Sequence, residues 1–421
     1  MPAVEPVERN RGVRANSEAD SVTKLVAAAR RAMEEFSREI NAHGQSRIDE
    51  AVTALAWSIY KPDNARRLAE IAVDVTGIGD VGSKVMKNQR KTFGTLRDLL
   101  RVKSTGVIEE IPEKGLIKYA KPVGVVGAIT PSTNPSATPV NKAMMAIKGG
   151  NAIIIAPPPT AWEATKPAVD GMRRELEKIG LPADLVQILP SPVTRTITTE
   201  LMERADLVVV TGSQVNVRQA YKSGKPAIGV GLGNAPVIVD TTADLADAAH
   251  KIMLSKTFDH ATSCSSENAI VVLDEIYDQT IDALRTEGGY LASAAERTRI
   301  VERLWQDGKL NRAVIAQGPN ALIKVFELAP TANGCKFVMV EETGIGEGHP
   351  LSGEKLSLVL TVYRAKDFAD AKRIVRDILD YQGKGHSCGI HTKNPAHARE
   401  LAEEIDVARV LVNQAHTFGN G

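Results

Sequence analysis

Short runs of β-branched and apolar residues alternate with helical stretches through the middle of this chain, and this alternation constrains its fold most strongly. The apolar runs are AIIIA (152–156), LVQIL (185–189), DLVVVTG (206–212) and APVIVD (235–240). The helical patterns between them span 137–148, 161–179 and 194–204. A strand–helix–strand rhythm is typical of parallel sheets with right-handed crossovers. We therefore expect an α/β protein.

The alternation resumes after Asp240, which predicts two successive α/β domains with parallel-rich sheets. A chain of 421 residues has room for both. Helical periodicity dominates the first hundred residues, after a polar arm of about twenty residues that lacks the apolar segment of a secretory signal. A Pro-Glu-Lys-Gly turn within 104–120 predicts a β-hairpin. We expect domains over 1–234 and 235–412, and a closing segment, 413–421, that returns towards the first domain.

The charge balance and the cysteine content exclude several classes of protein. Lys plus Arg is 52 and Asp plus Glu is 51, so nothing in the net charge of +1 favours nucleic acid or an anionic membrane as a partner. No apolar stretch approaches the ~18 residues of a membrane span. Three cysteines in 421 residues do not make a disulfide scaffold, so we expect a reduced, cytoplasmic setting.

Two glycine-rich segments invite comparison with a dinucleotide-binding loop. GVGLGN (229–234) and GIGEGH (344–349) do not match GxGxxG, and we interpret them as turns. A better candidate is VVVTGSQVNVRQAY (208–221), where a strand ends at Thr211-Gly212-Ser213 and a helix begins. Backbone N–H groups at such a helix start can bind a diphosphate, but Ser213 could equally be an ordinary N-cap.

Cys264 is the cysteine with the most polar surroundings, in TFDHATSCSSENAIVVL between a helix and a strand. Free cysteines are more often buried and inert, and Cys335 and Cys388 are interpreted in that way. The spacing of His386, Cys388 and His391 is too tight for the usual zinc pattern, so we expect no metal. His260, four residues before Cys264, could lower the pKa of that thiol or could cap its helix.

Taken together, these residues resemble the aldehyde dehydrogenase superfamily, and most closely its CoA-acylating branch, over about residues 20–421. The motifs that carry the resemblance occur in the family's order: KPVGVVGAITPSTNP (121–135), DLVVVTGS (206–213), GVGLGNAP (229–236), SCSSEN (263–268) and GEKLSLVLTVYRAKDF (353–368). The closing RVLVNQAHTFGNG (409–421) is similar to the acylating branch in particular. One such motif would be weak, whereas five in order are specific.

The resemblance implies a fold and a set of roles. The fold is an aldehyde dehydrogenase-like α/β fold with a cofactor-binding first domain, a catalytic second domain and a small oligomerisation hairpin. Cys264 is implied as the nucleophile and Asn134 as the oxyanion donor. The residues implied for binding NAD or NADP are Thr130, Pro131, Thr211, Gly212, Ser213, Gly233 and Glu354. Coenzyme A is the implied co-substrate, and a homodimer or homotetramer the implied assembly.

Departures from the family pattern refine the expected activity. Hydrolytic members carry a glutamate base where this chain has Gly231, which has no side chain to accept a proton. We therefore expect a small aldehyde to be oxidised to acyl-CoA through a Cys264 thioester. The TSCSSEN segment is most similar to members that act on sulfoacetaldehyde, which would give sulfoacetyl-CoA. The alternatives are a hydrolytic enzyme that releases a free acid and a non-catalytic structural member. A lysine that often contacts the adenosine ribose is replaced by APPPTA (156–161), which leaves NAD and NADP open.

Overall fold

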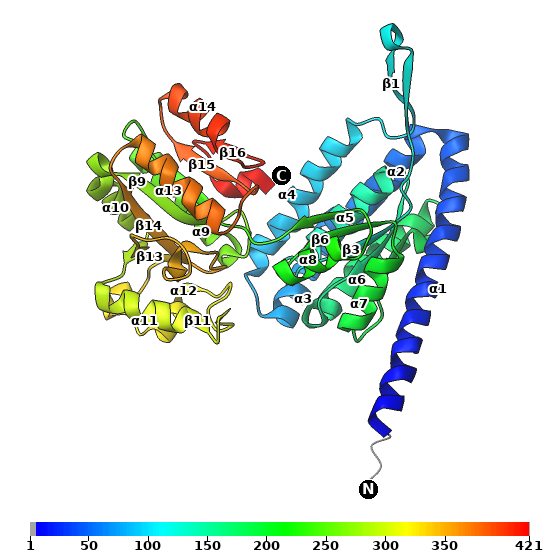
Figure 1. Ribbon diagram of the computed structural model, residues 1–421, viewed down its shortest axis with the longest axis horizontal. Coiled ribbons are helices and arrows are strands. Elements are labelled where there is room, and N and C mark those ends of the chain that lie inside the picture. Colours follow the sequence, from blue (N-terminus) through cyan, green and yellow to red (C-terminus); the bar gives the residue numbers. More distant parts are fainter. Residues whose placement is uncertain (1–5, 421) are drawn as a thin grey trace. The chain divides into compact units, whose positions relative to one another are not determined.

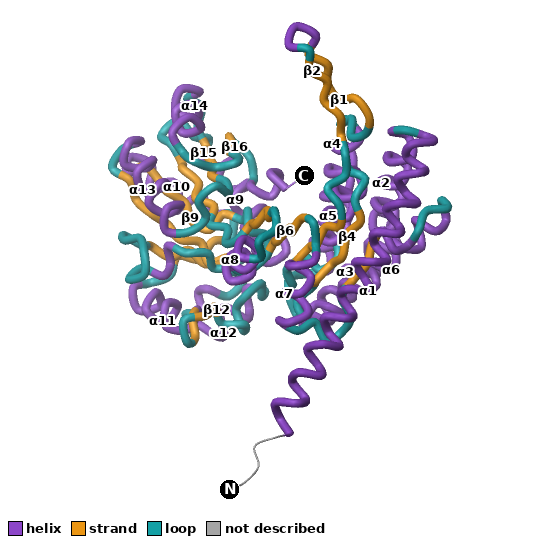
Figure 2. The backbone as a smooth tube through the Cα atoms, turned by 45° about the vertical axis from the view of Figure 1, so that its right-hand side comes forward, coloured by secondary structure: helices purple, strands orange, loops and turns teal. Residues whose placement is uncertain are grey.

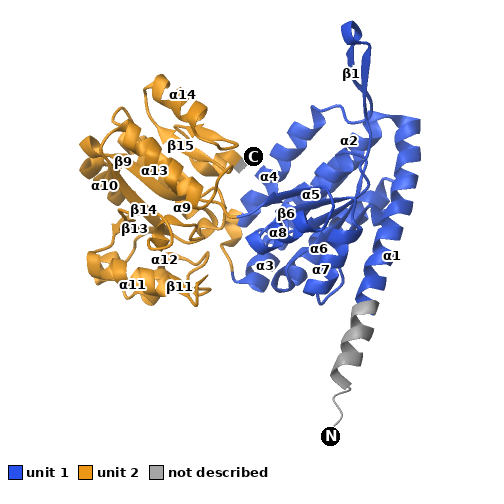
Figure 3. Cartoon of the chain, in the orientation of Figure 1, with its two compact units in different colours: residues 1–77, 84–231, 421 blue, residues 78–83, 232–420 orange. Residues whose placement is uncertain are grey.

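The computed structural model describes residues 6–420, and the side chains of 17–419. The chain divides into two compact units, which Figure 3 colours separately. Unit 1 contains residues up to 77 and 84–231, and unit 2 contains 78–83 and 232–420. The division at Gly231–Leu232 lies slightly before the domain boundary expected after residue 234.

Unit 1 is built on a five-stranded sheet in which every neighbouring pair is parallel. Its strands are β3 (Val125–Ile129), β4 (Ala152–Ala156), β5 (Val186–Ile188), β6 (Leu207–Thr211) and β7 (Ala227–Val230). The spatial order β5-β4-β3-β6-β7 runs outwards from β3 in both directions. The sheet is therefore doubly wound, with its switch point between β3 and β6, where such sheets bind ligands at the carboxyl ends of their strands.

Helices surround this sheet, some packed directly on its strands and others lying outside those helices (Figure 1). They are α1 (Pro6–His43), α2 (Gln45–Tyr60), α3 (Pro62–Thr76), α4 (Val81–Leu100), α5 (Ala137–Lys148), α6 (Trp162–Lys178), α7 (Arg195–Arg204) and α8 (Gln214–Lys222). All five residues of β3 and of β4 are buried, as expected for parallel strands with covered faces. This burial explains why both strands are unbroken apolar runs in the sequence.

The hairpin expected over 104–120 pairs β1 (Gly106–Ile111) with β2 (Leu116–Ala120) in antiparallel register. Gly115 has a φ of 62°, a left-handed conformation that glycine adopts without strain, so it closes the turn. Figure 2 shows the hairpin projecting from the helices of unit 1. Its large apolar side chains are exposed, among them Ile117 and Tyr119, so its role in oligomerisation stays a prediction.

The polar arm expected at the start of the chain is helical instead, because α1 already begins at Pro6. Proline is favoured in the first position of a helix, where its missing N–H has no intrahelical partner. No further proline interrupts the sequence before His43, so the helix continues. Residues 1–5 lie outside the described part of the chain.

Unit 2 is built on a seven-stranded sheet, again with only parallel pairs. In spatial order its strands are β10 (Gly289–Leu291), β13 (Phe337–Glu341), β14 (Val359–Ala365), β9 (Glu267–Leu273), β8 (Ala235–Val239), β15 (Cys388–His391) and β16 (Val410–Val412). Val237 and Val239 belong to one apolar cluster and Ile238 to another. Successive side chains thus enter cores on opposite faces of the sheet.

The helices of unit 2 are α9 (Leu245–Thr257), α10 (Tyr277–Thr286), α11 (Ala294–Leu304), α12 (Pro319–Phe326), α13 (Phe368–Tyr381) and α14 (Pro395–Glu404). A small antiparallel pair joins β11 (Trp305–Gln306) and β12 (Lys309–Leu310). In the described part of the chain, no helix has both the length and the apolar character needed to cross a membrane.

Residues 413–420 of the closing segment belong to unit 2. They are held there by local bonding: the His416 N–H donates to Glu267 Oε1 at 3.1 Å, and the Thr417 N–H donates to Ser255 Oγ at 3.2 Å. The return of 413–421 towards the first domain stays a prediction. Gly421 lies outside the described residues.

Candidate active site

Four loops of unit 2 that are far apart in the sequence end at one edge of its sheet. Gly233 precedes β8, Cys264 precedes β9, Glu354 precedes β14 and His386 precedes β15. These strands are neighbours in the order β14-β9-β8-β15 and all run parallel. Residues that precede neighbouring parallel strands meet at the same edge, here the amino edge.

The thiol of Cys264 is paired with a histidine. His386 Nε2 lies 3.2 Å from Cys264 Sγ, and His386 Nδ1 lies 2.8 Å from the hydroxyl of the buried Ser387. Burial lowers the pKa of His386, and the nearby Arg409 lowers it further, so the ring is neutral at pH 7. In the tautomer whose Nδ1–H donates to Ser387, Nε2 offers its lone pair to the thiol. His386 is thus placed to accept the proton that Cys264 must lose.

Gly233 and Glu354 lie beside this pair. The Gly233 N–H donates to Glu354 Oε1 at 3.1 Å. Burial raises the pKa of Glu354 to about 8, and the neighbouring Cys264 contributes to the rise. A small cavity is lined by Gly233, Cys264 and Glu354, together with Lys256 and other residues of unit 2. The structure thus brings together three of the residues singled out from the sequence.

Two buried asparagines hold the loops of this edge in place. The Asn234 side chain donates to the Ser352 carbonyl at 2.8 Å, and the Asn268 side chain donates to the Asn234 amide oxygen and to the Gly353 carbonyl. The Asn268 amide oxygen accepts from the N–H of Lys355 at 3.2 Å. This amide pair joins the segments that contain Gly233, Cys264 and Glu354, because the two asparagines and their partners lie in those three motifs or, for Ser352, directly before one of them.

Asn134 lies in unit 1, on the loop that follows β3. Its side chain is half-buried and forms no hydrogen bond within the described residues. The loop is held from α4, because Lys84 Nζ donates to the carbonyl of Thr133 at 3.2 Å. The amide of Asn134 therefore has donors available for an oxygen of a ligand. Its cooperation with Cys264, which lies in unit 2, stays a prediction.

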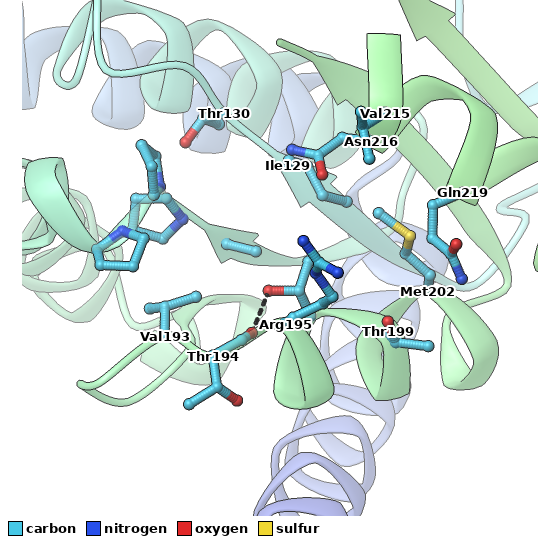
Figure 4. Close-up of a pocket in the computed structure, with 15 residues that line it drawn as sticks. Ile129, Thr130, Val193, Thr194, Arg195, Thr199, Met202, Val215, Asn216 and Gln219 are labelled. Atoms are coloured by element: carbon cyan, nitrogen blue, oxygen red, sulfur yellow. Dashed lines mark hydrogen bonds between the residues drawn. The ribbon is translucent and has the colours of Figure 1, made fainter. Parts of the chain in front are cut away.

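A pocket of about 400 Å³ opens in unit 1 where β3 and β4 end and α7 and α8 begin. Figure 4 shows its lining residues. The lining residues are Ile129, Thr130, Ala156, Pro157, Pro158, Pro159, Val193, Thr194, Arg195, Thr198, Thr199, Met202, Val215, Asn216 and Gln219. Its position at the switch point of a doubly wound sheet is where such folds bind nucleotides.

The residues of this region fit the adenine nucleotide half of NAD or NADP. Thr130 is only 3% exposed, and its hydroxyl lines the pocket without a hydrogen-bond partner, which leaves it available to a ligand. Ser213 is the N-cap of α8, because its hydroxyl accepts from the Asn216 N–H at 3.3 Å. The other backbone N–H groups of the first turn of α8 have no partner within the helix, so they can donate to a bound anion. A β-carbon on Gly212 would meet nothing within 4 Å, so the backbone there is open to a bound group. Of the cofactor residues named from the sequence, only Thr130 lines the pocket itself.

The remaining predicted cofactor residues divide between the two units. Thr211 ends β6 and leads through Gly212 and Ser213 into α8, two of whose residues, Val215 and Asn216, line the pocket. Pro131 follows Thr130 on the loop but does not line the pocket. Gly233 and Glu354 lie instead with the cysteine of unit 2, so their contact with a nicotinamide stays a prediction.

Gly231, where a hydrolytic relative would carry its base, adjoins Gln214 within unit 1. A β-carbon at Gly231 would lie 2.0 Å from Gln214 Oε1. Gln214 is an exposed, flexible side chain, so it can move aside, but in this chain its amide fills the place that the β-carbon of a residue at 231 would take. An amide has no basicity near neutral pH, so it does not replace the missing base.

The sequence did not reveal every residue of the site. His386 was considered only as a metal ligand, because nothing in the sequence shows that β15 lies next to β8. His260, the histidine considered for Cys264, lies instead against Gly318. Among the described residues, no three His, Cys, Asp or Glu side chains lie together as a metal site requires.

A nucleotide-type pocket at the switch point of one parallel sheet and a cysteine–histidine pair at the strand ends of another are features of an α/β enzyme. The chain belongs to the aldehyde dehydrogenase family, whose model matches residues 1–292.

Relatives narrow this assignment to the CoA-dependent branch. The chain is 49% identical over 408 residues to a sulfoacetaldehyde dehydrogenase (acylating) from Cupriavidus necator, a match that covers 97% of this chain and 82% of the relative. It is 36% identical to a succinate-semialdehyde dehydrogenase (acetylating) from Clostridium kluyveri, covering 95% and 87%. The crystal structure of an acetylating aldehyde dehydrogenase from Geobacillus thermoglucosidasius superposes with a TM-score of 0.91 at 32% identity, covering 96% of this chain and 88% of that one.

Proposed function

We propose that this protein is a CoA-acylating aldehyde dehydrogenase, which oxidises a small aldehyde to acyl-CoA with NAD or NADP. One combination of features carries the proposal: a Cys264 thiol paired with a neutral His386, in a chain that has no side chain at Gly231. The thiol can form an acyl-enzyme, and the chain lacks the base with which relatives hydrolyse it. The named relatives, which are acylating or acetylating enzymes, agree with this proposal.

The first step is the attack of sulfur on the aldehyde. Cys264 loses its proton to His386 Nε2, and the thiolate forms a carbon–sulfur bond with the carbonyl carbon while the π electrons move to oxygen. The side-chain amide of Asn134 and the backbone N–H of Cys264 donate to that oxyanion. One such donor contributes about 3–4 kcal/mol to transition-state stabilisation.

The carbonyl then re-forms as a thioester on Cys264. A bound NAD or NADP supplies the acceptor for the hydride that leaves the carbon. Glu354 supports this step by holding the nicotinamide ribose, a role proposed from its motif, and its hydrogen bond from Gly233 keeps the carboxyl group beside the cysteine.

The acyl group finally passes to coenzyme A. His386 first releases to solvent the proton it took from Cys264, and its Nε2 then accepts the proton of the coenzyme A thiol. The sulfur of coenzyme A forms a bond with the thioester carbon, and the bond from that carbon to Cys264 breaks, so that Cys264 leaves as a thiolate. Water is a poorer nucleophile and needs a base, which Gly231 cannot provide. The absence of a base at position 231 is therefore consistent with coenzyme A, rather than water, as the acceptor of the acyl group.

Among aldehydes, we propose sulfoacetaldehyde. The proposal is supported by the TSCSSEN motif and by 49% and 43% identity to two acylating sulfoacetaldehyde dehydrogenases, from Cupriavidus necator and Bilophila wadsworthia. A sulfonate is best held by arginine or lysine. Arg409, whose carbonyl accepts from the Cys388 N–H at 3.1 Å, is a cation of unit 2 whose charge also lowers the pKa of His386.

We also propose a homo-oligomer in the cytoplasm. The exposed apolar side chains of the hairpin, including Leu116 and Tyr119, would be covered by a second copy. A working thiol suits a reducing compartment. Light scattering of the purified chain and of a hairpin variant with L116E and Y119E tests the assembly, and a single species of monomer mass would contradict it.

The activity is tested by omitting coenzyme A. With sulfoacetaldehyde and NADP or NAD alone, we expect one equivalent of reduced nucleotide per active site, followed by almost no further formation of reduced nucleotide. Addition of coenzyme A then restores steady turnover and yields an acyl-CoA. Sustained turnover without coenzyme A would contradict the acylating assignment, whereas turnover with acetaldehyde in preference to sulfoacetaldehyde would contradict only the proposed substrate.

A further inference from the structure

The pocket of unit 1 contains a single charged side chain. Of the fifteen described residues that line it, Arg195 alone is ionisable, and the others are apolar, prolyl, hydroxyl or amide residues. Arg195 is the first residue of α7, directly after its N-cap Thr194. Figure 4 shows its guanidinium group pointing from α7 into the pocket.

Arg195 has no ionic partner among the described residues. Within that part of the chain its side chain forms no ion pair and no hydrogen bond, whereas Arg204 at the other end of α7 is paired with Glu200 at 2.9 Å. The guanidinium is also exposed, so its donors are free for a group that enters the pocket. Arginine binds phosphate through two parallel N–H donors, which makes an unpaired guanidinium a strong candidate for a phosphate partner.

The pocket lacks the group that would favour an unphosphorylated ribose. Sites that prefer NAD present an Asp or Glu to the ribose 2′-hydroxyl, whereas sites that accept NADP place an arginine near the 2′-phosphate. No described lining residue carries a carboxylate. The segment after β4, where many relatives have a lysine, contributes only Pro157, Pro158 and Pro159 to the lining. Arg195 is therefore the cation available to the 2′ position.

A second, independent observation marks the pocket as a binding site. Thr130 is buried to more than nine-tenths, lines the pocket, and has an unpartnered hydroxyl. Thr130 directly follows β3 at the switch point of the sheet. Asn216 and Gln219 line the pocket from α8. The polar groups thus come from three separate elements, which is the arrangement expected where a nucleotide binds across a doubly wound sheet.

From these observations we infer that Arg195 binds the adenosine 2′-phosphate of NADP, and that the chain consequently prefers NADP over NAD. The inference rests on the proposed function in taking this pocket as the site of the adenine nucleotide. It assigns a specificity-determining residue that lies outside the motifs named above, since Arg195 falls between those that end at 135 and begin at 206.

Direct binding tests the inference without aldehyde or coenzyme A. Titration calorimetry with NADP+ and with NAD+ would compare the wild-type chain with R195Q, R195K and the control R218Q. Arg218 is an exposed arginine on α8 that does not line the pocket, so R218Q removes the same charge from the same unit. We expect wild type to bind NADP+ at least tenfold more tightly than NAD+. R195Q should weaken NADP+ binding by roughly 10- to 100-fold and NAD+ binding much less.

The control variants decide between charge and structure. R218Q should bind both nucleotides as wild type does, and R195K should retain part of the preference because it keeps the charge but not the two-donor geometry. Equal or tighter binding of NAD+ by wild type, or an R195Q variant that keeps the preference, would overturn the inference and leave the proposed function standing. If neither nucleotide binds the wild-type chain, both the inference and the proposed function are overturned.

Discussion

A β-carbon on Gly233 would lie 2.3 Å from the backbone oxygen of Cys264 and 2.8 Å from its β-carbon. The two loops therefore touch through backbone atoms, with no room for any side chain. The obstacle is rigid, in contrast to the flexible Gln214 amide beside Gly231. Glycine at 233 is thus required by the position of the nucleophile.

Replacement of Gly233 by alanine should displace the Cys264 loop. We expect G233A to lose at least tenfold in kcat/KM, with overpacking that costs about 1–3 kcal/mol of stability. Steady-state kinetics and thermal unfolding measure the two effects. Gly348 provides the control, because a β-carbon there meets nothing within 4 Å. Wild-type activity in G233A would show that the loop relaxes freely.

The histidine beside the thiol should control its reactivity. Loss of His386 removes the base 3.2 Å from Cys264 Sγ, so H386A and H386Q should lower the rate of the nucleotide burst by about 10²- to 10⁴-fold. Alkylation of Cys264 by iodoacetamide at pH 7 should slow in parallel. His250, an exposed histidine paired with Glu287, is the matched control. Unchanged alkylation in both His386 variants would remove His386 from the mechanism.

The identity of the nucleophile is tested by comparing cysteines. C264A should abolish the burst, because no other described group of the site can form a thioester. C335A should retain it, since Cys335 packs against the apolar cluster of unit 2. Mass spectrometry of the enzyme after aldehyde and nucleotide alone should locate the acyl group on Cys264. Acyl label on another residue would contradict the assignment.

A carboxylate at position 231 should convert part of the activity. In G231E the new side chain must displace the Gln214 amide, and it then supplies the base that water needs. We expect turnover without coenzyme A to rise at least tenfold above wild type, and further in the double variant G231E/Q214A. Q214A alone should leave the dependence on coenzyme A unchanged. Absence of free acid from both G231E and the double variant would show that more than the base separates the two activities.

The carboxyl group of Glu354 should make stability depend on pH. Burial and the neighbouring Cys264 raise its pKa to about 8, against an ordinary 4.5, so the folded chain holds this proton more tightly than the unfolded chain. Its contribution to stability is therefore complete below about pH 4.5 and is lost as pH rises to about 8. E354Q cannot titrate, so its Tm should fall less than that of wild type across this range. E347Q, at an exposed position, should follow wild type, and parallel curves for E354Q and wild type would contradict the prediction.

Much of the fold follows from local pattern. The buried parallel strands β3, β4 and β8 are unbroken apolar runs, as is the AIVVL part of β9, and their burial on both faces explains that pattern. The short strands β7, β10 and β15 were not predicted, because three or four residues carry too little periodicity. Hairpin β1–β2 was predicted from its turn.

Residues of the candidate active site could be predicted only where they lie within one of the motifs of the resemblance. Cys264, Gly233 and Glu354 were selected by resemblance, and the structure brings them together at one sheet edge. His386 lies outside the motifs, and its approach to Cys264 depends on β15 pairing with β8, a long-range choice that no local sequence reports. The sequence likewise does not indicate a binding role for Arg195, since an arginine at a helix start is usually a solvated surface residue.

The two sheets present their functional residues at opposite strand ends, the carboxyl ends in unit 1 and the amino ends in unit 2. The residues proposed to choose the nucleotide therefore belong to one unit and the thiol chemistry to the other. Exchange of the redox carrier is in this sense a modular change. A substitution at position 195 could therefore change which nucleotide accepts the hydride, while the reactions that deliver the aldehyde or consume its thioester stay the same.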